Sequence, residues 1–203
     1  MRAFIILDSF TVTLDPDNVI VCMMFQSDVV TLMVLCIGGC GAGKTLLLSL
    51  LQDKNFNTDT SLVPTVGVNI FTILAQTGKK NTTVEIPIRE LGGGLCPLWR
   101  DYLKSETSVI FVINSLDLSK AGLVAVKLCE TLAELESVSR EENKVCRLCV
   151  VWTRSGDVNT FARVLRLREL VQDSCVIYTE IRVDIETQVG LQSIRHWLLQ
   201  SVA

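Results

Sequence analysis

The chain contains 203 residues, of which 49% are hydrophobic and 20% are charged. This length and composition suit one domain with a large buried core, and they exclude a disordered, highly charged chain. The formal net charge of -3 lacks the excess of basic residues that general nucleic-acid binding requires, so we expect no nucleic-acid partner.

Direct membrane attachment is not expected from the sequence. The uncharged stretch from Val29 to Gly43 contains four glycines and falls short of the roughly 18–20 apolar residues of a spanning helix, so no transmembrane segment is predicted. Arg2 stands where N-myristoylation requires glycine, and the last residues contain no prenylation box. Without a secretory signal, the eight cysteines indicate reduced thiols and a cytoplasmic protein, with any membrane association made through partners.

The first predicted elements surround a glycine-rich loop. Residues 1–28 do not follow the pattern of the rest, and we interpret them as an N-terminal extension of uncertain order, either an extra strand or partly disordered. The apolar, β-branched run 29–37 predicts a strand that is buried on both faces. After the loop at 38–43, the leucine-rich segment 44–52 predicts a helix.

Strands and helices alternate along the rest of the chain. Residues 69–75 and 82–88 predict a hairpin, although Pro87 cannot donate a hydrogen bond to a ladder. The alternation predicts an α/β fold over 29–203, with a mostly parallel six-stranded sheet and helices on both faces. The remaining predicted strands are 108–114, 145–152 and 175–183, and the remaining helices are 121–139, 159–173 and 190–201.

A phosphate-binding motif follows the first buried strand. The spacing G-x-x-x-x-G-K-T ends in Lys44 and Thr45, directly between a predicted strand and a predicted helix. Backbone N–H groups of the loop can turn toward phosphates, the lysine can reach the β- and γ-phosphates, and the threonine can ligate Mg²⁺. The motif therefore predicts nucleotide binding with magnesium. The loop residues are Gly38, Gly39, Cys40, Gly41, Ala42 and Gly43.

Four later segments resemble the ADP-ribosylation factor (Arf) family of small GTPases. Residues 64–69 resemble the family's switch I segment, and residues 90–94 lie where the family has Asp-x-Gly-Gly-Gln. Residues 97–102 resemble the switch II helix, and residues 110–115 resemble the strand that follows it. The resemblance implies a P-loop small-GTPase fold with an antiparallel interswitch strand, bound GTP or GDP, and effector and regulatory proteins that dock on the switch regions. Glutamate at position 90, in place of aspartate, indicates a divergent Arf-like branch.

The resemblance also implies roles for individual residues. Thr65 would ligate Mg²⁺ and contact the γ-phosphate through its backbone, and the N–H of Gly93 would sense the same phosphate. Glu90 would hold a Mg²⁺-bound water, with some adjustment for its extra methylene. Taken singly, Thr65 also fits an ordinary loop residue, and Glu90 also fits a solvated strand end.

Two positions depart from the family pattern. Gly94 occupies the position of the glutamine that orients the attacking water, so no catalytic residue is assigned and we expect slow hydrolysis. The family's Asn-Lys-x-Asp motif is reduced to Asp157, which we expect to accept hydrogen bonds from guanine. The aliphatic stem of Arg154 or the indole of Trp152 would cover the base, although Trp152 fits the core better.

These features predict a GTP-binding switch that recruits effectors in intracellular membrane or ciliary traffic. A degenerate GTPase that acts as a largely nucleotide-independent interaction module is an alternative, which the lost glutamine and altered base motif favour. A P-loop kinase or ATPase is a third alternative, but it would require an arginine-rich lid.

Trp99 fits either an effector contact or packing beneath the switch. Arginines 163, 166 and 168 fit either a solvated helix face or an anion-binding patch.

Overall fold

The protein is described as two separate units. The chain divides into Met1–Thr31 and Leu32–Ala203. In the first unit, β1 (Ala3–Leu7), β2 (Phe10–Asp15) and β3 (Asn18–Ile20) form an antiparallel sheet with β2 in the middle. None of these strands belongs to the sheet of the second unit. The predicted boundary at residues 28 and 29 lies outside the described residues. The structure, a computed structural model, describes residues 3–7, 10–15, 18–20, 33–52, 64–77, 83–104, 107–154 and 156–201.

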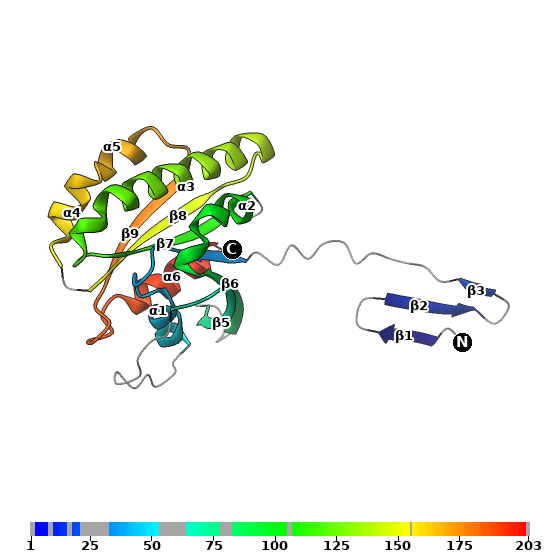
Figure 1. Cartoon of the computed structure of the whole chain (residues 1–203). Coiled ribbons are helices and arrows are strands. Elements are labelled where there is room, and N and C mark those ends of the chain that lie inside the picture. Colours follow the sequence, from blue (N-terminus) through cyan, green and yellow to red (C-terminus); the bar gives the residue numbers. More distant parts are fainter. Residues whose placement is uncertain are drawn as a thin grey trace. The chain divides into compact units, whose positions relative to one another are not determined.

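Six strands form the sheet of the second unit in the order β5-β6-β4-β7-β8-β9 (Figure 1). Neighbouring strands are parallel except β5 and β6, which pair antiparallel at one edge of the sheet. This arrangement confirms the predicted α/β fold, including its antiparallel interswitch strand. The strands are β4 (Val34–Ile37), β5 (Val68–Gln76), β6 (Thr83–Leu91), β7 (Ser108–Asn114), β8 (Arg147–Thr153) and β9 (Ile177–Val183).

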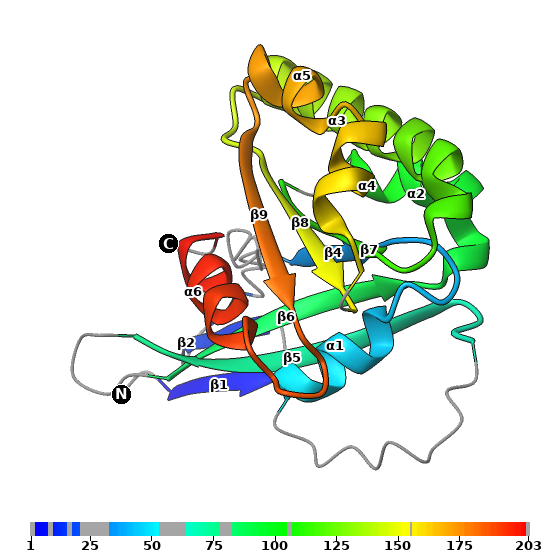
Figure 2. The same ribbon diagram turned by 90° about the vertical axis from the view of Figure 1, so that its left-hand side faces the viewer.

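Helices cover both faces of this sheet (Figure 2). Helices α1 and α6 lie on one face, and α2, α3, α4 and α5 lie on the other. Among the described residues, no helix has both the length and the apolar character needed to cross a membrane. The α-helices are α1 (Lys44–Leu51), α2 (Trp99–Leu103), α3 (Ala121–Glu142), α4 (Val158–Val164), α5 (Leu167–Gln172) and α6 (Leu191–Ser201), and two 3₁₀ helices are η1 (Gly93–Leu98) and η2 (Leu118–Lys120).

The central strand β4 supplies side chains to two separate cores. Val34 and Cys36 join the core under α1 and α6, whereas Leu35 and Ile37 join the core under α2 to α5. All four side chains are fully buried. Because successive residues of a strand point to opposite faces, a strand covered on both faces must be apolar at every position. The continuous apolar run in the sequence has this physical origin.

The predicted helix 159–173 is wrong as a single element. Arg166 adopts a left-handed conformation with φ 51° and separates α4 from α5. Residues two apart on one helix point about 200° away from each other, so a continuous helix would bury only one of Leu165 and Leu167. The break allows both leucines to be buried.

The predicted strand boundaries also shift by a few residues. The described part of the first strand begins at Val34, and residues 29–32 lie outside the described residues. Strand β6 continues to Leu91, three residues beyond the predicted end at residue 88. Pro87 is tolerated within β6 because the ladder with β4 begins only at Ile88.

The packing of Phe161 gives a test of the core on the α4 side. This side chain is fully buried, and its ring lies edge-on against Trp152 at a centroid distance of 5.7 Å. Phe161→Ala would leave a cavity between α4 and β8, so we expect the free energy of unfolding in urea to fall by about 3–5 kcal/mol. Leu123→Ala, at a side chain that is 58% exposed on α3, is the matched control and should change stability by less than about 0.5 kcal/mol. Equal effects of the two substitutions would contradict this packing.

Candidate nucleotide-binding site

The glycine-rich loop lies between the end of β4 and the start of α1. Because β4 is parallel to both β6 and β7, the carboxyl ends of these three strands meet at one edge of the sheet, where open α/β sheets bind ligands. A methyl group at Gly38 would lie 2.4 Å from the carbonyl oxygen of Val112 in β7. Gly43 has φ 90°, in the left-handed region that favours glycine. Close packing against β7 therefore requires glycine at position 38, and the left-handed backbone of the loop favours glycine at position 43.

The lysine of the loop is held by backbone carbonyls. Lys44 is only 6% exposed, and its Nζ donates to the carbonyl oxygens of Gly38 at 2.9 Å and Gly39 at 3.2 Å. This places the ammonium group over the loop, where a phosphate-binding lysine is needed. Burying a lysine to this extent is costly unless its ammonium group has hydrogen-bond partners, and here the two carbonyls supply them.

Three predicted magnesium residues lie together beside the loop. The Thr45 hydroxyl donates to Glu90 Oε1 at 2.5 Å and lies 2.9 Å from the Thr65 hydroxyl oxygen. Thr65 Oγ1 also donates to Glu90 Oε1 at 3.3 Å, and Asn69 Nδ2 donates to Glu90 Oε2 at 3.2 Å. Glu90 is fully buried. The structure thus places residues from α1, from the segment before β5 and from β6 at one point.

This cluster fits a hard cation. Hydroxyl and carboxylate oxygens are the ligands that Mg²⁺ prefers, and the cluster borders a cavity of about 120 Å³ lined also by Lys44, Pro64 and Gly93. No group of three or more histidine, cysteine, aspartate or glutamate side chains that could hold a metal ion occurs within the described ranges. Burial raises the pKa of the neighbouring Cys36 thiol, which therefore stays neutral at physiological pH.

The segment after β6 packs directly against the loop. The N–H of Gly92 donates to the carbonyl oxygen of Gly67 at 2.9 Å. A methyl group at Gly93 would lie 2.4 Å from the backbone nitrogen of Cys40, so only glycine permits this approach. Gly94 is exposed and has open space around its Cβ position. A side chain at position 94 is therefore sterically possible.

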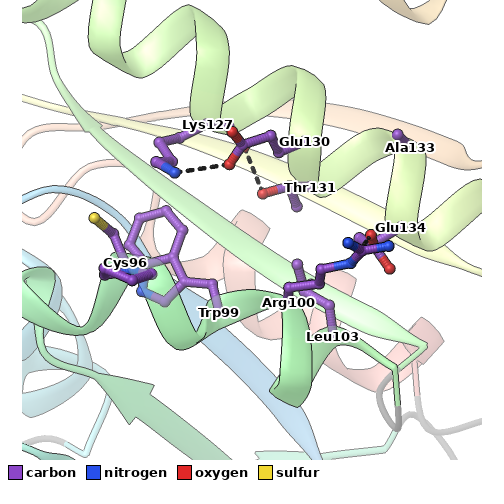
Figure 3. A pocket seen from close by; sticks show the side chains of 10 residues that line it. Cys96, Trp99, Arg100, Leu103, Lys127, Glu130, Thr131, Ala133 and Glu134 are labelled. Carbon is purple, nitrogen blue, oxygen red and sulfur yellow. Dashed lines mark hydrogen bonds and ion pairs between the residues drawn. The ribbon is translucent and has the colours of Figure 1, made fainter.

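The helices η1 and α2 form a groove with α3 (Figure 3). A cavity of about 440 Å³ lies between η1, α2 and α3. Trp99 is buried beneath it and packs edge-on against Phe111 at a centroid distance of 5.9 Å, so in this conformation it is a packing residue. Two ion pairs flank the groove, Lys127 with Glu130 at 2.7 Å and Arg100 with Glu134 at 2.5 Å.

The loop after β8 is tied to the phosphate-binding loop and to β7. Thr153 is fully buried, and its hydroxyl donates to the carbonyl oxygen of Ala42 at 2.7 Å. The Ser115 hydroxyl donates to the carbonyl oxygen of Arg154 at 2.9 Å and accepts from the N–H of Gly156 at 3.0 Å. A methyl group at Gly156 would lie 2.2 Å from the Ser115 carbonyl oxygen, so this position also requires glycine.

The two residues predicted to contact the base lie on this loop. Arg154 is exposed with φ 70°, and Asp157 is exposed at the N-cap of α4. The backbone N–H of Thr160 donates to Asp157 Oδ1 at 3.0 Å and, with the Thr160 hydroxyl, holds the pKa of this carboxyl below its ordinary value. Asp157 therefore stays ionised and can accept hydrogen bonds at neutral pH. Trp152 is fully buried, which confirms its interpretation as a core residue.

Three residues that support the site were not assigned from the sequence. Asn69 could have been found from the hairpin, because it lies opposite Glu90 in the β5–β6 register. Thr153 and Ser115 carry no local signal, since their partners are 111 and 39 residues away in the chain. These side chains hold the loops together without belonging to any motif.

The fold and this site define a nucleotide-binding P-loop protein with the small-GTPase fold. The chain belongs to the ADP-ribosylation factor family, whose model matches residues 19–202. This confirms the family resemblance seen in the sequence. The roles assigned to single residues stay predictions.

Individual relatives agree with this assignment. Human ADP-ribosylation factor-like protein 16 is 29% identical over 178 residues, which are 82% of this chain and 84% of that protein. ADP-ribosylation factor-like protein 1 of Caenorhabditis elegans is 32% identical over 105 residues, 51% of this chain and 53% of that protein. The fold matches the structure of the Arl6 BBS3 small GTPase from Trypanosoma brucei with bound nucleotide analogue GppNp, with a TM-score of 0.66 at 20% identity over 84% of this chain and 96% of that chain.

Asp157 allows base recognition to be tested without loss of the helix cap. Asparagine caps helices as well as aspartate does, but it lacks the second acceptor oxygen that the N1–H and N2–H₂ of guanine require. We expect Asp157→Asn to weaken GTP binding by at least about tenfold in titrations with labelled nucleotide, while ATP binding stays weak and unchanged. Unchanged GTP affinity would show that Asp157 only caps α4.

Proposed function

We propose that this Arf-family GTP-binding switch hydrolyses GTP slowly and recruits effector proteins in intracellular membrane or ciliary traffic. The family match and the small-GTPase relatives support the GTP-binding switch itself. The proposal adds a magnesium ion, a slow chemical step and effector docking. It also places the protein in the cytoplasm, with membrane association through its partners.

One contact carries the proposal, the meeting of Thr45 with Thr65 and Glu90. Thr45 belongs to the phosphate-binding motif, whereas the other two belong to the segments that resemble the switch regions. A ligand that binds at Thr45 therefore acts on both segments through direct hydrogen bonds. A nucleotide can order or release the two switch-like segments only if such contacts connect them to the phosphate-binding loop.

The Gly92–Gly94 segment is the element that the terminal phosphate would move. Gly93 lies so close to the Cys40 backbone that a phosphate between them requires the segment to shift. Lys44 would release its carbonyl partners to bind the β- and γ-phosphates, and the N–H of Gly93 would bind the γ-phosphate in the shifted position. Thr45, Thr65 and Glu90 would hold Mg²⁺, which supplies positive charge against the phosphates.

Effector docking is supported by exposed apolar side chains on the switch-like segments and on the adjoining start of β5. Val66 is 95% exposed, Ile70 is 66% exposed and Leu98 is 47% exposed. Exposed apolar side chains of this kind gain free energy when a partner covers them. The role in membrane or ciliary traffic rests on family membership alone.

Gly94 explains the expected slow hydrolysis and provides its test. Gly94→Gln adds the amide that can orient water, and the open space around residue 94 accepts it. We expect single-turnover GTP hydrolysis to rise by at least about tenfold, which corresponds to a barrier lower by about 1.4 kcal/mol. Gly94→Ala adds a Cβ without the amide and should leave the rate unchanged. Equal rates in the glutamine and alanine variants would remove the explanation.

The identity of the bound nucleotide tests the proposed function as a whole. We expect mass spectrometry of the denatured purified protein to detect released GDP or GTP. Release of ADP or ATP would support a kinase or ATPase instead. A site that stays empty with added GTP and Mg²⁺ would support the nucleotide-independent module, which Gly94 and the close packing of Gly93 on the loop favour.

A further inference from the structure

A second cavity, about 590 Å³ in volume, lies between α4, α5 and β9. Four arginines line it: Arg163 from α4, Arg166 from the turn, Arg168 from α5 and Arg182 from β9. It shares no lining residue with the cavity at the phosphate-binding loop. It also lacks Arg154 and Asp157, the residues predicted to contact the base, so it is distinct from the predicted nucleotide site.

The break at Arg166 is what gathers these arginines. On one continuous helix, Arg166 and Arg168 would point about 200° apart, and only one of them could line a given cavity. The left-handed turn at Arg166 redirects α5, so that arginines from both helices line one cavity. Arg182 is added from β9, the strand at the edge of the sheet.

The positive charge of the cavity lining exceeds its negative charge. Arg166 forms an ion pair with Glu169. Arg163 and Arg182 are held by neutral oxygens, Thr160 Oγ1 at 3.1 Å and Asn159 Oδ1 at 2.8 Å, and neither they nor Arg168 has an ion pair within the described part of the chain.

The two acidic residues of the lining offset part of this positive charge. Glu169 pairs with Arg166, and Glu180 accepts from Trp152 Nε1 at 3.0 Å. Three guanidinium groups have no ion pair among the described residues, and the four arginines and two glutamates give the lining a formal charge of +2 in a protein whose formal net charge is -3. Two of them are already oriented by hydrogen bonds, which lowers the entropy cost of binding.

We propose that this cavity, which we call the arginine cavity, binds a phosphate-bearing ligand. Guanidinium groups match phosphate oxygens with paired N–H donors, and a phosphomonoester carries a charge of about -1.5 to -2 that several arginines can share. The apolar side chains of Val158, Ala162 and Leu167 line the same cavity and suit the carbon part of such a ligand. A phosphoinositide headgroup and a soluble phosphate compound share this chemistry.

Binding is measured in the presence of excess GDP and Mg²⁺, so that the phosphate-binding loop is occupied. The soluble probe is inositol trisphosphate, and the membrane probe is phosphatidylcholine vesicles with and without phosphatidylinositol bisphosphate. We expect at least one probe to bind, with an affinity that falls as salt rises. Binding of the soluble probe alone identifies a soluble ligand, and binding of the vesicles alone identifies a headgroup in its membrane.

Matched substitutions decide whether the arginine cavity is responsible. Arg168→Gln should weaken binding about tenfold, because each charge-assisted hydrogen bond to phosphate contributes on this scale. Arg140→Gln removes one charge from an exposed arginine of α3, outside the cavity, and should have little effect. Arg168 is exposed and forms no hydrogen bond among the described residues, so thermal unfolding of both variants should match the wild type.

Three results would overturn the proposal. The first is that neither phosphate probe binds, and the second is that Arg140→Gln weakens binding as much as Arg168→Gln does. The third is that a glutamate-rich peptide binds more tightly than either phosphate probe, which would identify an acidic protein segment as the ligand.

Discussion

The buried carboxylate of Glu90 is the constraint on which the nucleotide site depends. A fully buried carboxylate is costly unless donors surround it, and here Thr45, Thr65 and Asn69 supply them. These donors come from the start of α1 and from residues 65–69, and both regions are distant in sequence from Glu90. Satisfying one carboxylate therefore fixes the positions of the loop, the segment before β5 and the end of β6 together. The glutamate, one methylene longer than the family's aspartate, reaches these hydroxyls directly.

The sequence predicted those parts of the fold and site that depend on local pattern. The run ending at Ile37 predicted a strand covered on both faces because both cores demand apolar side chains there. Lys44 and Thr45 were predicted because strand, glycine loop and helix are contiguous in the chain. The meeting of Thr65 with Glu90 followed from their resemblance to family segments, since nothing local joins residues that are 25 positions apart.

The parts that could not be predicted depend on long-range packing. The break at Arg166 arises because Leu165 and Leu167 must both be buried, a demand set by the surrounding core and invisible in a leucine-rich helical pattern. Thr153 and Arg182 likewise have partners on other elements. In these cases tertiary contacts overrode or supplemented local propensity.

The position of Gly38 has a consequence for how variants of this protein are interpreted. Its Cβ position is blocked by the Val112 carbonyl oxygen of β7 and not by space reserved for a ligand, whereas Gly41 has nothing near its Cβ position. A side chain at Gly38 therefore pushes apart two neighbouring strands of the sheet before any phosphate is considered. Loss of nucleotide in such a variant would measure misfolding as much as binding. The first glycine of the loop is thus maintained by the architecture of the sheet as well as by the chemistry of its ligand.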